Sequence, residues 1–204
     1  MTAELLLAFV AFAFVTSVTP GPNNMMLLAS GVNFGLRRSV PHMLGISLGF
    51  MVLVMAVGLG LGQVFQRFPA LYDILRYAGA TYLLYLAWKI ANASAPDSER
   101  GARGKPFSFL QAAAFQWVNP KAWVMAIGAI TTYTPQDNFV VNVLLIAALF
   151  ALVNCPSVGI WTVAGSLLRN WLENPRVLRA FNLIMALLLV ASLYPIFADA
   201  KGVM

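Results

Sequence analysis

The residues of this chain that can do chemistry gather in two short stretches, VTSVTPGPNNMMLL at 15–28 and QWVNPKAW at 116–123. Both stretches combine proline with asparagine inside apolar sequence, and the second adds Lys121. Asparagine amides donate and accept hydrogen bonds, and a lysine ammonium binds anions such as carboxylates. An ionisable residue in the middle of an apolar segment indicates a functional site, although a lysine can also extend to a membrane interface and serve packing alone.

The rest of the sequence offers little material for catalysis or metal binding. It contains one histidine, His42, and one cysteine, Cys155, and its seven acidic residues lie at or beyond the ends of the apolar segments. An enzyme site or a metal centre needs several such groups together. We therefore expect no catalytic residue, no metal and no cofactor. His42, near the start of the second apolar segment, is either a structural residue or a proton relay.

The composition excludes a soluble globular domain. Hydrophobic residues make up 60% of the 204 residues, charged residues make up 10%, and the mean hydropathy is +0.79. A soluble domain carries roughly a quarter charged residues. The formal charge of +6 would suggest nucleic acid as a partner of a soluble protein, but here the basic residues lie between apolar blocks. That pattern is typical of membrane topology, so we expect a lipid bilayer as the surroundings and no nucleic-acid partner.

Six apolar segments, each about as long as a bilayer is thick, follow one another along the chain. Such segments form helices, because every backbone polar group must be satisfied inside the lipid. The sequence therefore predicts an all-α polytopic membrane protein with six transmembrane helices. Glycines spaced by four, such as Gly45 and Gly49, predict close helix packing. The six segments cover 4–32, 40–62, 74–91, 108–131, 139–168 and 177–197.

The polar stretch NASAPDSERGARGKP divides the chain into two halves of three segments each. We predict a first repeat at 1–92, a cytoplasmic linker at 93–107 and a second repeat at 108–204. Nine of the thirteen basic residues lie in loops one, three and five, three lie on the opposite side, and Lys121 lies within segment four. Because basic residues favour the cytoplasmic side, loops one, three and five are predicted to be cytoplasmic.

The two proline-containing stretches interrupt segments one and four at corresponding positions. A shift of 100 residues aligns Thr19-Pro20 with Asn119-Pro120. Proline lacks an N–H and favours the first position of a helix, so we predict two half-helices in each segment, with Thr19 or Asn119 as an N-cap. Gly21 would permit an unusual backbone there. Three helices per half place the halves in opposite orientations, which predicts an inverted repeat with helices one and four broken.

Half-helices that start near the bilayer centre would direct their free N–H groups and positive dipole ends at one place, which favours a carboxylate. Two alternatives stay open. The breaks could only kink two packed helices, and Asn23 and Asn24 could cap freed carbonyls instead of binding a ligand. The predicted substrate-binding residues are Thr19, Pro20, Gly21, Pro22, Asn23, Asn24, Asn119, Pro120 and Lys121.

These motifs resemble the LysE/RhtB family of bacterial amino-acid exporters. The resemblance rests on TPGPNN followed by Gly35-Leu36-Arg37, and on GISLGF, AGATYLLYLAWKI and FQWVNPKAW, and it spans essentially the whole chain. The combination of GISLGF, LAWKIA and KPFSF is most similar to the cysteine/O-acetylserine exporter branch of that family.

The resemblance implies a secondary transporter, not an enzyme, that exports small amino acids across the bacterial inner membrane. It implies substrates such as cysteine, O-acetylserine, homoserine or threonine, and the proton motive force as the driving force. His42, Lys121 and the substrate itself are the candidates for carrying the proton, because no acidic residue lies inside a segment. A homo-oligomer is compatible with this reading. The alternative is a passive channel or a membrane assembly subunit without coupled transport.

Overall fold

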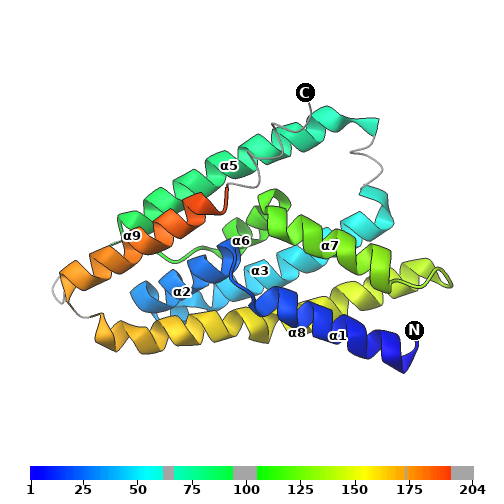
Figure 1. Ribbon diagram of the computed structural model, residues 1–204, viewed down its shortest axis with the longest axis horizontal. Helices are drawn as coiled ribbons and strands as arrows, with labels where there is room; N and C mark the ends of the chain where they lie inside the picture. The colour runs from blue at the N-terminus through cyan, green and yellow to red at the C-terminus, as the bar shows by residue number, and fades with distance from the viewer. Residues whose placement is uncertain (62–66, 94–104, 173, 194–204) are drawn as a thin grey trace.

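The computed structural model of the chain describes residues 1–61, 67–93, 105–172 and 174–193. These residues form eight α-helices and three short helical turns, with no strand among them, which confirms the predicted all-α class. Most helices run along the long axis of the molecule, and α5 and α9 pack together along one side (Figure 1). The helices are α1 (Ala3–Val18), α2 (Pro22–Phe34), α3 (Leu36–Ala56), α5 (Pro69–Ala91), α6 (Phe109–Phe115), α7 (Pro120–Tyr133), α8 (Phe139–Leu168) and α9 (Pro175–Ala191). The turns are η1 (Val57–Leu61), η2 (Gln116–Val118) and η3 (Arg169–Trp171).

Segments one and four are broken, as predicted. The first consists of α1 and α2, which are bent by 56° across the break. The fourth consists of α6, the turn η2 and α7, with the chain extended at Asn119. In Figure 1, α2 and α7 both begin in the middle of the molecule and run to opposite ends. The two half-helix starts therefore meet near the centre, as the sequence predicts.

The first break differs from the prediction in its helix start. Asn119 is the N-cap of α7, as predicted, and Pro120 is the first residue of that helix. In the first break, however, Thr19 ends α1, and Gly21 precedes α2, which starts at Pro22. A residue before proline disfavours the helical region, so the chain stays extended until the second proline. The prediction that Thr19 caps a helix start is therefore wrong.

Among the described residues, two helices are long and apolar enough to cross a membrane, and a bent pair makes a third span if it is counted as one. The two helices are Leu36–Leu61 with 26 residues and Phe139–Leu168 with 30, and the bent pair is α1–α2. The 30-residue helix α8 coincides with predicted segment five. α3 and α5 begin before their predicted segments, at Leu36 and Pro69. Residues 94–104 of the predicted linker and the end of segment six beyond residue 193 lie outside the described residues.

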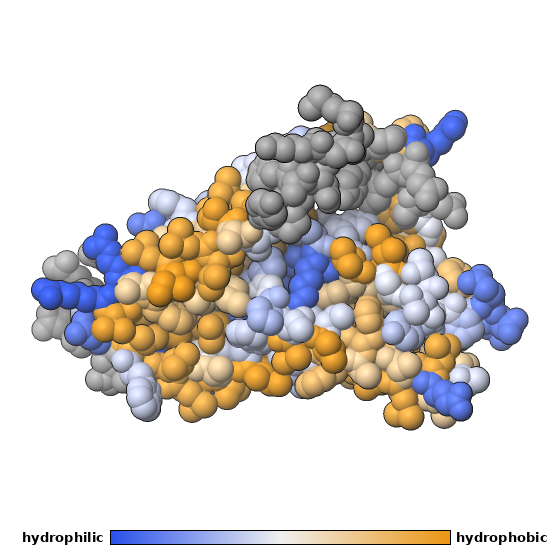
Figure 2. Space-filling view, viewed as in Figure 1, coloured by the Kyte–Doolittle hydropathy of each residue, from blue (hydrophilic) through white to orange (hydrophobic). Residues whose placement is uncertain are grey.

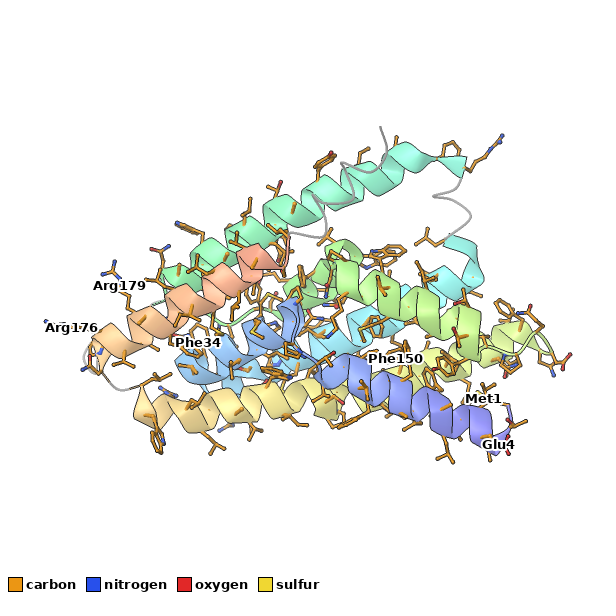
Figure 3. All side chains as sticks on the ribbon, viewed as in Figure 1. Met1, Glu4, Phe34, Phe150, Arg176 and Arg179 are labelled. Atoms are coloured by element: carbon orange, nitrogen blue, oxygen red, sulfur yellow. The ribbon has the colours of Figure 1, made fainter. Side chains whose placement is uncertain are left out.

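The polarity of the molecule follows its long axis. Arg176 and Arg179 lie at one end, and Met1 and Glu4 lie at the opposite end (Figure 3). Hydrophilic residues gather at both ends, and hydrophobic residues cover much of the face between them (Figure 2). On α8, for example, Leu152 is 70% exposed. Helices that are apolar on their outer face as well as their inner face suit a lipid environment, so the chain is a membrane protein.

Glycines allow backbone-to-backbone packing in the half of the molecule that carries the arginines. A side chain at Gly31 of α2 would collide with the Thr162 carbonyl of α8, and one at Gly165 of α8 would collide with a carbonyl of α2. Gly45 and Gly49 of α3 lie equally close to α6, as their spacing predicts. In this half the helices approach as closely as their backbones permit.

Aromatic side chains hold the helices together in the other half. The ring of Phe150 on α8 lies edge-on to Phe50 of α3, with centroids 4.7 Å apart, and to Phe9 of α1 at 5.5 Å. Tyr133, the last residue of α7, packs on Phe9 and Phe12. Figure 3 places Phe150 in this half and Phe34 in the glycine-packed half.

The close crossing of α2 and α8 gives a first prediction. Gly165→Ala should lower the thermal stability of the purified protein, because overpacking of this kind costs about 1–3 kcal/mol. Gly128→Ala on α7 is the matched control, since an added Cβ there would lie 3.4 Å from its nearest atom, an ordinary contact. Thermal unfolding followed in detergent checks the difference, and equal melting of the two variants would contradict the crossing.

Candidate functional site at the two helix breaks

Pro20 and Pro22 remove two backbone N–H groups from the first segment. In a continuous helix these groups would donate to the carbonyls of Thr16 and Val18. The Thr16 carbonyl instead accepts a hydrogen bond of 3.0 Å from the threonine hydroxyl three residues later. The Val18 carbonyl accepts one of 3.0 Å from the indole N–H of Trp161 on α8. Both carbonyls that the prolines leave without a partner are therefore satisfied by side chains.

Asn24 satisfies two further carbonyls at the end of α1. Its Nδ2 donates to the Ser17 carbonyl at 2.9 Å and to the Thr19 carbonyl at 2.7 Å. The amide nitrogen of Asn24 thus caps the broken helix, which is one of the two roles that the sequence left open. Its Oδ1 is different, because it is buried and has no hydrogen-bond partner among the described residues.

Lys121 connects the two breaks. Its Nζ donates to the Thr19 carbonyl at 2.7 Å, to the Thr19 hydroxyl at 2.9 Å and to the Pro20 carbonyl at 3.4 Å. The ammonium group therefore lies at the C-terminal end of α1, where the helix dipole favours a cation. Its side chain reaches across to the other break instead of extending along its own helix.

A pair of side-chain amides forms a second connection between the breaks. Asn23 Nδ2 donates to Gln116 Oε1 at 2.8 Å, and Gln116 Nε2 donates back to Asn23 Oδ1 at 3.2 Å. Gln116 Nε2 also donates to the Ala112 carbonyl at 2.8 Å, and its side chain is fully buried. Sequence reasoning missed Gln116, although it lies in QWVNPKAW as a buried polar residue of an apolar segment.

The two helix starts differ in how their N–H groups are capped. At the start of α7, Asn119 Oδ1 accepts a hydrogen bond of 3.2 Å from the Lys121 N–H. At the start of α2 no side chain of the described residues caps the helix, and its first backbone bond runs from the Met25 N–H to the Gly21 carbonyl. The N–H groups of Asn23 and Asn24 precede that bond. The free, positive helix end that the sequence predicts at both breaks therefore belongs to α2.

Gly21 leaves room for the lysine. Its φ of −178° is extended backbone, so the predicted need for an unusual conformation is wrong. A Cβ at this position would instead lie 2.8 Å from Cδ of Lys121 and 3.3 Å from its Nζ. Glycine here permits the close approach of the Lys121 side chain to the end of α1.

A small cavity lined by both polar and apolar side chains lies between the breaks. The space that the centre of a water molecule can occupy is about 20 Å³, which is enough for roughly one water molecule. Five of the nine predicted site residues line it, and the other four, Thr19 and the prolines at 20, 22 and 120, shape the backbone around it. The five lining residues are Gly21, Asn23, Asn24, Asn119 and Lys121.

Asn154 also lines the cavity and was not predicted. Its Nδ2 donates to the Ser17 hydroxyl at 3.0 Å, and its Oδ1 accepts from the Ser47 hydroxyl at 3.0 Å. It therefore ties α8 to α1 and α3. The sequence does contain a signal for it, because a polar residue in the middle of the longest apolar helix is costly and so indicates a functional position.

His42 does not line the cavity. It is fully buried on α3, its ring lies 5.1 Å from that of Phe107, and neither ring nitrogen has a hydrogen-bond partner among the described residues. The same part of the chain contains no group of three or more histidine, cysteine, aspartate or glutamate residues that could hold a metal ion.

Comparison with known proteins places the chain in one family. The family model described as LysE type translocator matches residues 14–192. Proteins named cysteine/O-acetylserine efflux protein are similar over nearly the whole chain, with 35% identity over 199 residues, 97% of this chain and 100% of each relative. They come from Escherichia coli (strain K12), Escherichia coli O9:H4 (strain HS) and Shigella sonnei (strain Ss046). No solved structure matches the chain.

The matched residues include both helix breaks and every residue that lines the cavity between them. The resemblance expected from TPGPNN and FQWVNPKAW is thereby confirmed over both halves of the chain. This chain belongs to the LysE family of translocators.

Proposed function

We propose that this chain is a secondary transporter that exports small amino acids across the bacterial inner membrane. The proposed substrates are cysteine, O-acetylserine, homoserine or threonine, and the proposed driving force is the proton motive force. The family and the relatives named cysteine/O-acetylserine efflux protein support the proposal. The observation that carries it is a cavity lined by asparagine, glutamine and lysine side chains within an apolar bundle, at which two helix breaks meet.

The start of α2 is the proposed binding place of the substrate carboxylate. It presents the uncapped N–H groups of Asn23 and Asn24 and the positive end of the helix dipole. Near this helix start, the ammonium of Lys121 donates hydrogen bonds to the carbonyl oxygens of Thr19 and Pro20. A carboxylate in the cavity would share that ammonium with the end of α1, and Asn119 would hold the start of α7 in place.

The size of the cavity implies a conformational step. Space for roughly one water molecule is too small for an amino acid, so the described arrangement is a contracted state of the site. Substrate binding must separate the breaks, and the two connections to be loosened are Lys121–Thr19 and Asn23–Gln116. A site that opens and closes in this way suits alternating access in a transporter.

The helix contacts support six spans in two inverted repeats, at 1–92 and 108–204, joined by the linker 93–107. Exchange of the halves relates α3 to α8, α5 to α9 and α1 to α6. α3 packs on α8 and α5 packs on α9, and the contact of α1 with α8 has its counterpart in the contact of α6 with α3. α3 and α8 run in opposite directions, as inversion requires (Figure 1).

The proposed orientation places loops one, three and five in the cytoplasm. The arginine-bearing end of the molecule in Figure 3 would then be the cytoplasmic end, and the end with Met1 and Glu4 would face outward. In this orientation α2 runs from the cavity to the cytoplasm and α7 runs to the outside. The proton would be carried by Lys121, by His42 or by the substrate.

Transport in everted membrane vesicles tests the proposal, because such vesicles import what cells export. L-cysteine, O-acetylserine, homoserine and threonine would be offered to energised vesicles that contain the chain. At least one should accumulate above its outside concentration, and a protonophore should abolish the accumulation. Vesicles without the chain provide the control. Equilibration without accumulation would indicate a passive channel instead, and absence of uptake for all four would contradict amino-acid export.

Lys121 gives a second prediction for transport. Lys121→Met keeps the aliphatic side chain but removes the donor to Thr19 and Pro20, and should reduce the transport rate at least about tenfold. Gly21→Ala should also reduce it, because the added Cβ displaces the Lys121 side chain without a change of charge. Transport is divided by the amount of protein in the membrane, and Gly128→Ala is the control. Wild-type rates for a well-inserted Lys121→Met variant would remove Lys121 from the site.

A further inference from the structure

We propose that the side-chain oxygen of Asn24 binds the α-ammonium group of the substrate. The inference rests on the proposed function, since it assigns a role within amino-acid export. In this proposal, two groups of Asn24 recognise the two opposite charges of one zwitterionic substrate. The Asn24 side chain would accept from the ammonium, and the backbone at the start of α2 would donate to the carboxylate.

Asn24 Oδ1 is a buried acceptor without a partner among the described residues. The residue is 2% exposed and lines the cavity. The orientation of its amide is fixed, because Nδ2 faces the carbonyls of Ser17 and Thr19 and these groups only accept hydrogen bonds. A flip of the amide would place Asn24 Oδ1 against the carbonyl oxygens of Ser17 and Thr19, and none of these atoms could donate. The unpaired acceptor is therefore built into the break, and a buried acceptor in that state destabilises the protein unless something donates to it.

Two neighbouring side-chain donors of the cavity wall are already engaged with other acceptors. The Lys121 ammonium makes three hydrogen bonds to Thr19 and Pro20, and Asn154 Nδ2 donates to the Ser17 hydroxyl. A group that enters the cavity is the donor that this proposal assigns to Asn24 Oδ1. The cavity space of about 20 Å³ admits one group of the size of a water molecule or an ammonium. Of these two, the ammonium makes the stronger, charge-assisted hydrogen bond.

The same residue provides the complementary donor. The N–H groups of Asn23 and Asn24 are uncapped at the start of α2. In an α-amino acid the ammonium and the carboxylate are attached to one carbon atom, so their partners must also lie close together. The N–H and the side-chain oxygen of Asn24 belong to one residue and meet this condition. The arrangement favours an α-amino acid over a carboxylic acid that lacks the amino group.

The second break provides a matched control. Asn119 also lines the cavity, but its Oδ1 already accepts from the Lys121 N–H. Asn119→Ala therefore removes an asparagine that caps a broken helix, without removing an unpaired acceptor. Asn24→Ala removes both a cap and the unpaired acceptor. Asn24→Asp removes the donor to Ser17 and Thr19 and keeps an acceptor oxygen.

The experiment measures binding of two probes to the purified full chain in lipid nanodiscs under reducing conditions. The probes are L-cysteine and 3-mercaptopropanoate, which lacks only the amino group. The wild type should bind L-cysteine roughly 10- to 100-fold more tightly, the range expected for a hydrogen bond to a charged group. Asn24→Ala should reduce this ratio about tenfold or more. Asn119→Ala should keep the ratio, and Asn24→Asp should keep or raise it because a carboxylate attracts the ammonium, even if both probes bind more weakly.

The ratio separates recognition from structure, because a purely structural role of Asn24 would weaken both probes equally. A wild type that binds the two probes alike would overturn the inference and leave the proposed function standing. An unchanged ratio in Asn24→Ala, or equal losses of the ratio in all three variants, would overturn it too. If the Asn24 variants fail to fold, a wild type that binds the two probes alike would still overturn the inference. Absence of L-cysteine binding, combined with failure of all four amino acids in the vesicle assay, would overturn the proposed function itself.

Discussion

The loss of two backbone N–H groups at Pro20 and Pro22 is the constraint on which the centre of the molecule depends. In an apolar bundle, each carbonyl that loses its helical partner needs a donor from elsewhere. The Thr19 hydroxyl is one such donor, and the others come from three further helices: Asn24 belongs to α2, Lys121 to α7 and Trp161 to α8. One interruption therefore fixes the mutual positions of four helices. The break that interrupts the first helix is therefore also the place where side-chain hydrogen bonds connect the two halves of the chain.

The same requirement makes the two breaks unequal. The break in segment four is satisfied locally, because Asn119 caps the helix that follows it. The break in segment one uses side chains from distant parts of the chain and keeps the start of α2 uncapped. Free donors, a free acceptor and a cation thus collect on one side of the cavity. The proposed zwitterionic substrate, with its ammonium and carboxylate attached to one carbon atom, needs an asymmetric site of this kind, and one break alone would not supply the Lys121 ammonium.

The sequence was sufficient to predict the helical class, both breaks and the meeting of the half-helix starts, because proline and long apolar runs act locally. It was not sufficient to choose between Pro20 and Pro22 as the start of α2, since either proline could begin a helix. Gly21 was assigned a backbone role although its contact is with a side chain 100 positions away. Gln116 and Asn154 were missed for the same reason: their partners lie 93 and 137 positions away, and only the packed fold brings them together.

The packing of the two ends has a mechanical consequence. Towards the arginine-bearing end, α2 lies on α8 and α6 lies on α3 with glycine at the contact, so backbone meets backbone. Backbone surfaces in contact cannot yield without separating as rigid bodies. Towards the other end, Phe9, Phe12, Tyr133 and Phe150 fill the space between α1, α7 and α8, and side chains of this kind can change rotamer one at a time. A widening of the cavity would therefore require different changes at the two ends: separation of packed backbones at the arginine-bearing end, and rotamer changes of aromatic side chains at the end that carries the N-terminus.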